Sequence, residues 1–258
     1  MPHRKHLTAS PFGAAMSLAS TWLYFLILQT ADSFGLAAIF AVILLHFTLL
    51  YALASKFQRT TAGEWMRGAI VGLNAGLNGI LLFFFTENIT VSGAIAVIIM
   101  LAAFLPVSRH RVYHTVIGWL NWLLPMSWLV TYPGMMIYLI NLMAAPLGYI
   151  YPVLRGLRVK LYIDLRSCSF TMYGGLIRPV KGFSGLNMGN FIFINPGWEH
   201  LLKHEIGHLF SLAALGFAFH YIGGIDENYV QENYREAYAE YLAESYSTPG
   251  VSTLSMWR

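Results

Sequence analysis

Charged residues are scarce in this sequence. Asp, Glu, Lys and Arg make up 11% of the 258 residues, whereas about 25% is usual for a soluble domain. Apolar residues account for 57% of the chain, and the mean hydropathy is +0.55. So little charge cannot cover the surface of a water-soluble globule, and this composition also excludes a disordered chain, a coiled coil and collagen. We therefore expect lipid to form part of the solvent of this protein.

Cysteine is almost absent as well. Cys168 is the single cysteine, so an intramolecular disulfide framework is excluded. The net charge of +4 comes from basic residues in short clusters between apolar runs, not from a basic face of one helix. We therefore expect no nucleic-acid partner and interpret the basic clusters as signals of membrane topology.

The composition changes near residue 150. Residues 1–150 contain seven Lys or Arg and three acidic residues, whereas residues 151–258 contain nine of each. This contrast predicts a transmembrane helical domain at 1–150 and a small water-facing domain at 151–258.

Several apolar segments of the first part are long enough to cross the hydrocarbon as helices, which requires about 17–25 residues. Prolines interrupt the last two segments, so 115–150 is also compatible with a re-entrant hairpin or one kinked helix. The sequence predicts about six transmembrane helices, at 12–30, 36–54, 68–86, 91–107, 115–131 and 134–150.

Lys and Arg alternate between successive connections. They occur before residue 6 and in 55–67, 108–114 and 155–160, and they are absent from 31–35, 86–90 and 131–134. Because basic residues collect on the cytoplasmic side, this alternation predicts a multi-pass protein whose N-terminus and C-terminal domain are cytoplasmic.

The C-terminal domain begins with patterns typical of strands. Residues 159–165 alternate between polar and apolar, and residues 190–195 are rich in β-branched and aromatic side chains. After Asn195-Pro196-Gly197 the pattern becomes helical. We therefore expect an α+β domain in which strands precede a helix.

That helix contains the sequence His204-Glu205-Ile206-Gly207-His208, which is an H-E-x-x-H pattern. Residues four apart share one helix face, so His204 and His208 can bind one Zn²⁺ while Glu205 contacts the water on it. His200 extends the row, but it lies about 12 Å along the axis from His208 and cannot bind the same ion. These residues predict metal-assisted hydrolysis with Glu205 as general base.

A catalytic zinc ion needs a third protein ligand. A predicted helix downstream carries acidic residues four apart, and their mutual repulsion favours a nearby cation. The candidates for the third ligand are Glu232, Glu236, Glu240 and Glu244.

These residues resemble the gluzincin metallopeptidases, in which a later helix supplies a glutamate ligand, commonly within E-x-x-A-[DE]. Glu236 to Glu240 fits this pattern. The resemblance therefore implies that Glu236 binds zinc, and that Glu240 interacts with the metal ligands without binding zinc itself. Glu240 to Glu244 fits as well, and Glu236 is preferred because it is closer to His208 in sequence. The resemblance also implies a zincin-like fold, a peptide or protein substrate, and 190–195 as the edge strand that binds it.

Other interpretations remain open. Residues 209–225 are almost wholly apolar, which is compatible with a site-2-protease-like intramembrane metalloprotease. His204 to His208 also fits the H-E-x-G-H form of that family, although its later Asp-Gly motif is missing. A membrane-anchored binding or regulatory protein with a non-catalytic zinc site is a further alternative, while the shortage of charge in the apolar segments disfavours a transporter. Candidate oxyanion donors are His220, Tyr221, Tyr229, Tyr234 and Tyr238.

Overall fold

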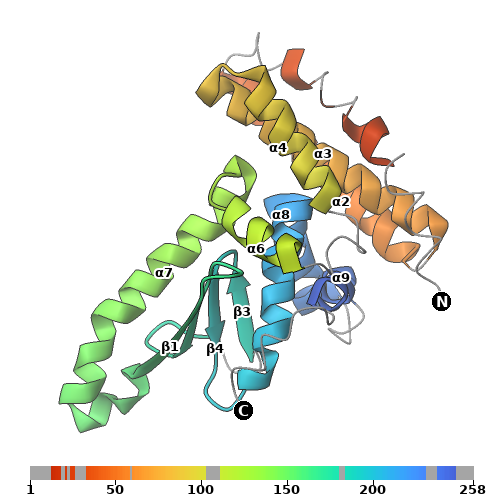
Figure 1. Cartoon of the computed structure of the whole chain (residues 1–258). Helices are drawn as coiled ribbons and strands as arrows, with labels where there is room; N and C mark the ends of the chain where they lie inside the picture. Colours follow the sequence, from red (N-terminus) through yellow and green to blue (C-terminus); the bar gives the residue numbers. More distant parts are fainter. Residues whose placement is uncertain are drawn as a thin grey trace. The chain divides into compact units, whose positions relative to one another are not determined.

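The structure is a computed structural model that describes residues 13–18, 21, 24–26, 33–58, 60–102, 111–179, 184–230 and 237–247. Figure 1 follows these elements along the chain. The chain forms two compact units: Met1–Ser108, Leu124–Met126 and Ala214–Leu242 make up unit 1, and Arg109–Leu123, Ser127–Ala213 and Ala243–Arg258 make up unit 2. The predicted change from a membrane domain to a water-facing domain near residue 150 stays a prediction.

Unit 1 is helical. It contains α2 (Ser33–Lys56), α3 (Thr61–Thr86) and α4 (Ile89–Ala102), and α3 contacts both of the others. The helix α3 starts where the Thr60 hydroxyl accepts a hydrogen bond from the Gly63 N–H at 3.2 Å, an N-cap that satisfies a free donor. It ends at Glu87, which adopts the left-handed conformation.

Two charged residues that the sequence assigned to a loop belong to α3. Glu64 and Arg67 are buried in its first two turns, and the Arg67 guanidinium lies 2.7 Å from the Glu64 carboxylate. The prediction of a loop over 55–67 is therefore wrong beyond Thr60. A hydropathy pattern counts both charges against the helix, whereas pairing allows them to be buried together.

Unit 2 contains α6 (Arg111–Leu120), most of α7 (Pro125–Ile150), the short helix η1 (Pro152–Leu157) and a four-stranded sheet. The strands are β1 (Val159–Asp164), β2 (Ser169–Gly174), β3 (Gly185–Met188) and β4 (Phe191–Ile194), in the order β1-β2-β4-β3. The strands predicted at 159–165 and 190–195 are confirmed as β1 and β4. However, β4 lies between β2 and β3, so the prediction of 190–195 as an edge strand is wrong.

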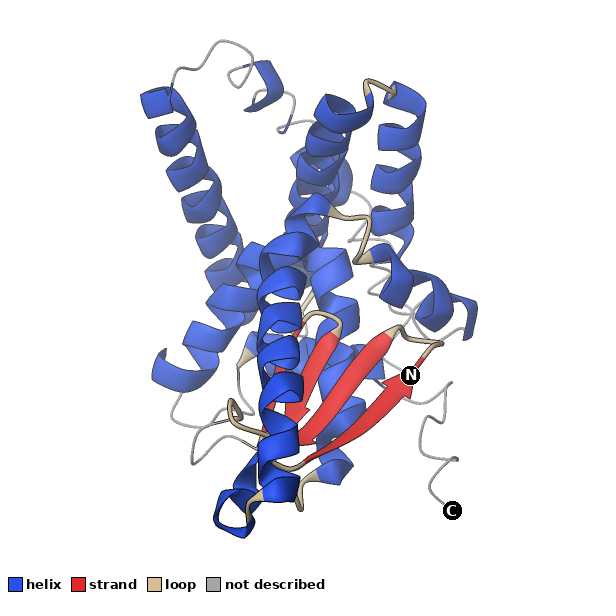
Figure 2. Cartoon of the chain, turned by 90° about the vertical axis from the view of Figure 1, so that its left-hand side faces the viewer, coloured by secondary structure: helices blue, strands red, loops and turns tan. Residues whose placement is uncertain are grey.

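The sheet has a helix on each face. Tyr138 of α7 packs against Met172, Phe191 and Phe193, which share one face of the sheet, and Figure 2 shows α7 crossing in front of the strands. The other face carries Asn187, whose side-chain amide donates to the backbone carbonyl of Glu205 at 2.9 Å. The first part of the H-E-x-x-H helix is therefore fixed against the sheet within unit 2.

Within the part of the chain that the structure describes, four helical stretches are long and apolar enough to cross a membrane: Ala37–Lys56, Thr61–Thr86, Pro125–Ile150 and Glu199–Val230. These stretches are consistent with a membrane protein, but the predicted count of six spans is not confirmed. The segment 91–107 corresponds to the shorter α4, and of 12–30 the structure describes only 13–18, 21 and 24–26.

The region 115–150 is not two spans. The helix α6 ends at Leu120, and α7 runs unbroken through Pro133 and Pro146. The connection expected at 131–134 is therefore inside a helix. It no longer counts as one of the connections without Lys or Arg on which the predicted alternation depends. The cytoplasmic location of the C-terminal region stays a prediction.

Candidate metal centre

The H-E-x-x-H residues lie near the start of α8 (Leu202–Ile225), which follows the short helix η2 (Glu199–Leu201). Residues up to Ala213 belong to unit 2. Besides the bond from Asn187, the Leu209 carbonyl accepts a hydrogen bond from the Asn121 side chain at 3.0 Å. Ile206, Leu209 and Phe210 are buried, so packing of this part of α8 fixes the backbone positions of the two histidines.

The two imidazoles face each other across one turn of α8. The Nε2 atoms of His204 and His208 lie 3.2 Å apart, and both side chains are half-buried. Two nitrogens that ligate one tetrahedral zinc ion at 2.0–2.1 Å would be about 3.3 Å apart. The spacing of these donors therefore fits a single zinc ion.

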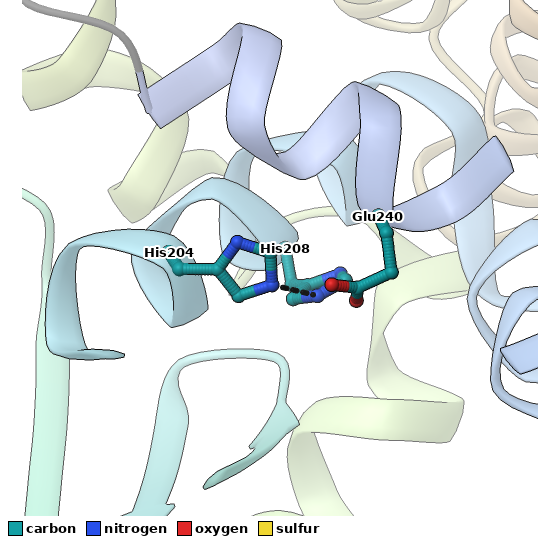
Figure 3. Close-up of side chains that lie close together, drawn as sticks. All are labelled: His204, His208 and Glu240. Carbon is teal, nitrogen blue, oxygen red and sulfur yellow. Dashed lines mark hydrogen bonds between the residues drawn. The ribbon is translucent and has the colours of Figure 1, made fainter. Parts of the chain in front are cut away.

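A carboxylate completes the cluster. Glu240, on α9 (Tyr238–Ser247), offers an oxygen atom in a group whose ligand atoms all lie within 4.8 Å of one another. Figure 3 shows this carboxylate beside the two imidazoles. Two histidines and one glutamate form a ligand set that zinc uses in hydrolytic enzymes.

Helix packing explains why Glu240 is close. In unit 2, Gly207 of α8 lies directly against the backbone of Ala243, and a Cβ atom at Gly207 would collide with the Ala243 carbonyl. Glu240 precedes Ala243 by three residues on the same helix, so its side chain points from the same side of α9. Gly207 is therefore a close-packing glycine, which lets α9 approach α8.

Glu205 faces a different neighbour. It is 6% exposed, and its carboxylate lies against Gly185 at the start of β3, where a side chain of any size would collide with it. Because β3 is an edge strand, Glu205 contacts the sheet at its edge. This contact was not predictable, since nothing in a glycine twenty residues upstream indicates contact with Glu205.

The remaining candidates have different surroundings. Glu236, which the sequence favoured as third ligand, lies outside the described residues, as do Glu232 and Tyr234. His200 is exposed on η2 and its ring lies 5.5 Å from that of Trp198, as expected for a residue that does not share the ion. Tyr238 is buried against Tyr51.

Comparison with known proteins adds no assignment. No family model matches the chain, and neither the curated proteins nor the solved structures contain a match. The chemistry of this cluster therefore has to be argued from its own geometry.

Proposed function

We propose that the protein is a membrane-bound zinc metallopeptidase in which His204, His208 and Glu240 hold the metal ion and Glu205 is the general base. The observation that carries this proposal is the 3.2 Å separation of the two imidazole Nε2 atoms, together with a carboxylate oxygen within 4.8 Å of them. Three protein ligands leave one tetrahedral position for water or substrate, which is the arrangement of catalytic zinc sites.

The residues around the ion divide the chemistry of peptide hydrolysis between them. Zinc, when bound, supplies a Lewis acid that polarises a carbonyl group and makes water more acidic. The Glu205 carboxylate accepts the proton of the attacking water and delivers it to the leaving amine. Its burial beside Gly185 keeps competing water away, and Asn187 fixes the backbone of Glu205.

Glu240 takes the ligand role in this proposal instead of Glu236. The support is that its carboxylate belongs to the described cluster, whereas the resemblance to gluzincins fits both registers. Glu236 remains one turn earlier in the sequence, so the experiment has to compare the two directly.

The zinc content of variants of the candidate ligands identifies the residues that bind the ion. Zinc per chain is determined by elemental analysis of detergent-purified protein, for the wild type and for His204→Ala, Glu236→Gln and Glu240→Gln. Glu199→Gln is the matched control, because Glu199 is an exposed carboxylate on the short helix η2 and belongs to none of the candidate ligand sets. We expect about one zinc ion per wild-type chain, and loss of zinc in His204→Ala and Glu240→Gln only. Loss in Glu236→Gln with retention in Glu240→Gln would reverse the register, and a wild type without zinc would refute the site.

Glu205→Gln separates a peptidase from a protein with a non-catalytic zinc site. We expect this variant to keep its zinc and to lose cleavage of a randomised mixture of fluorescence-quenched peptides, because an amide cannot accept the proton. Zinc bound by the wild type without any metal-dependent cleavage of these peptides would favour the binding or regulatory alternative.

The apolar character of α8 does not by itself require that the reaction occurs inside the bilayer. Most of the apolar residues from Leu209 to Phe219 are buried against other parts of the protein, so the chain itself already accounts for their hydrophobicity. The proposed substrate is therefore a peptide or protein segment that reaches the cluster from water, on the side that the basic clusters predict to be cytoplasmic.

A further inference from the structure

The outer face of α7 is a continuous apolar stripe. The helix has 26 residues from Pro125 to Ile150 and contains no charged residue. Its exposed side chains recur every three or four positions, which places them on one face. These side chains are Leu129, Tyr132, Met136, Leu139, Met143 and Leu147.

The opposite face of α7 is covered by the sheet for most of its length. Gly134 lies against Met188 of β3 and Phe191 of β4. One turn later Tyr138 joins the aromatic core of the sheet, and the Asn141 side chain both accepts from the Ile177 N–H and donates to the Ile177 carbonyl, each at 2.7 Å.

The sheet still accompanies α7 at its end. Arg158 donates from Nε to the Gly148 carbonyl at 2.8 Å, and the Tyr149 hydroxyl donates to the Val159 carbonyl at 2.9 Å. The sheet and its loops therefore lie beside α7 from residue 134 to residue 149.

This contact conflicts with a helix that crosses the bilayer. A helix of this length extends over about 39 Å and the hydrocarbon is about 30 Å thick, so a crossing α7 would bring the accompanying sheet to the depth of the lipid chains. The unpaired edge of β1 would then lie there together with exposed Lys160 and Arg166. Open sheet edges and exposed charged side chains are both excluded from lipid-exposed positions in the hydrocarbon.

The exposed charges of the sheet strands and of the turns between them are basic, although exposed Glu199, shortly after β4, interacts with Lys160. Among the described residues from 127 to 198, Asp164 is the only acidic residue, and it is buried. The basic residues of the same stretch are exposed, and such a surface is attracted to anionic lipid headgroups. They are Arg155, Arg158, Lys160, Arg166 and Arg178.

We propose that α7 lies in the plane of an anionic membrane surface, with its apolar stripe in the outer part of the acyl region and the sheet on the water side. In this orientation the apolar stripe contacts lipid chains, and the edge of β1 stays outside the hydrocarbon. The basic residues lie close enough to the headgroups to be attracted to their negative charge. In-plane helices of this kind lie about 5–10 Å below the headgroup boundary.

The orientation also bears on the metal centre, a consequence that rests on the proposed function. The first part of α8 packs on the face of the sheet opposite α7. Glu205 and the two histidines would therefore be separated from the lipid by the thickness of the sheet. Their substrate would then be a segment that projects from the membrane into water.

Depth measurements along the stripe test the orientation. Single cysteines replace Leu129, Met136, Met143 and Leu147 in a Cys168→Ala background, and each is spin-labelled after reconstitution into vesicles of phosphatidylcholine and phosphatidylglycerol. Paramagnetic relaxation by oxygen, which partitions into lipid, is compared with relaxation by a water-soluble nickel chelate. Glu199→Cys is the water-facing control, because Glu199 is exposed on η2, ahead of the part of α8 that packs on the face of the sheet opposite α7.

We expect all four stripe positions to be accessible to oxygen and to have nearly equal depth, while the Glu199 position is accessible to nickel. A depth maximum at Met136 and Met143 with shallow ends would show a crossing helix and refute the proposal. Low accessibility to both reagents would refute it too, in favour of a protein partner or a second copy. If Cys168→Ala does not fold, the same labels are placed in the wild-type background, where Cys168 is buried, and mass spectrometry verifies that its thiol stays unlabelled.

These readings need neither metal nor activity. A helix found to cross the membrane would leave the zinc measurements untouched, and a protein without zinc would leave the depth profile untouched.

Discussion

Gly207 of α8 and Ala243 of α9 are in backbone contact, with the glycine directly over the Ala243 carbonyl. This contact sets how closely α9 approaches the histidine pair, and therefore where Glu240 lies. The glycine between Ile206 and His208 is needed for this close approach and has no chemical role of its own.

Gly207→Ala should push α9 away from α8. The added methyl group has no room, so we expect a loss of about 1–3 kcal/mol in stability and a zinc affinity about 10- to 100-fold weaker, as when the support of a ligand is removed. Thermal unfolding in detergent and competition with a zinc chelator measure the two effects. Gly224→Ala is the control on the same helix, because a Cβ atom there meets nothing within 4 Å; an equal loss in both variants would contradict the explanation.

Tyr51 links α2 to the start of α9 within unit 1. Its hydroxyl donates to the Asp226 carboxylate at 2.7 Å and accepts a hydrogen bond from the Ala239 N–H at 3.3 Å. Ala239 immediately precedes Glu240, so Tyr51 holds the residue next to the proposed ligand.

Tyr51→Phe should therefore weaken both the fold and the site. Removing the buried hydroxyl costs about 1–3 kcal/mol, and we expect a lower melting temperature together with faster loss of zinc to a chelator. Tyr151→Phe, which changes an exposed tyrosine, should alter neither. A melting temperature of Tyr51→Phe equal to that of the wild type would show that the hydroxyl contributes nothing.

Gly216 divides α8 into two helical parts. Its φ of 86° and ψ of 174° belong to a region that only glycine adopts readily. The Asn74 side chain fills the space where a Cβ atom would lie and donates to the Ala214 carbonyl at 3.1 Å.

Gly216→Ala should lower stability by about 1–3 kcal/mol through backbone strain, with a further loss from collision with Asn74. Adding Asn74→Ala removes the collision but not the strain, so the double variant should unfold at a lower temperature than Asn74→Ala alone. If the two unfold at the same temperature, the backbone at Gly216 is not strained by a side chain.

Periodic and local patterns were predictable from the sequence. The strand at 159–165 was visible as alternation and that at 190–195 as a run of β-branched and aromatic residues, and the facing of His204 and His208 followed from helix geometry alone. The buried Asn78 of α3 bonds to another helix, since it accepts a hydrogen bond from the Met126 N–H at 3.1 Å.

Non-local contacts were not predictable. The order of the strands depends on β3 returning antiparallel to β4, and no local pattern specifies that choice. The predicted division of 115–150 into two segments was wrong because it relied on prolines as helix breakers. Pro133 and Pro146 remain inside one helix that packs on the sheet. The buried pair of Glu64 and Arg67 looked like a loop because hydropathy ignores pairing.

Burial of Cys168 makes the stability of the folded protein depend on pH. Its thiol is buried, and this burial raises its pKa, while a hydrogen bond of 3.2 Å from Trp122 Nε1 offsets part of the effect. The unfolded chain therefore loses the thiol proton at a lower pH than the folded protein, so stability from this group is complete below the ordinary thiol pKa of about 8.5 and falls as the pH rises above it. We expect the melting temperature of the wild type to fall more than that of Cys168→Ala between pH 7.5 and 9.5. Parallel curves for the two proteins over this interval would show that the thiol is not the group responsible.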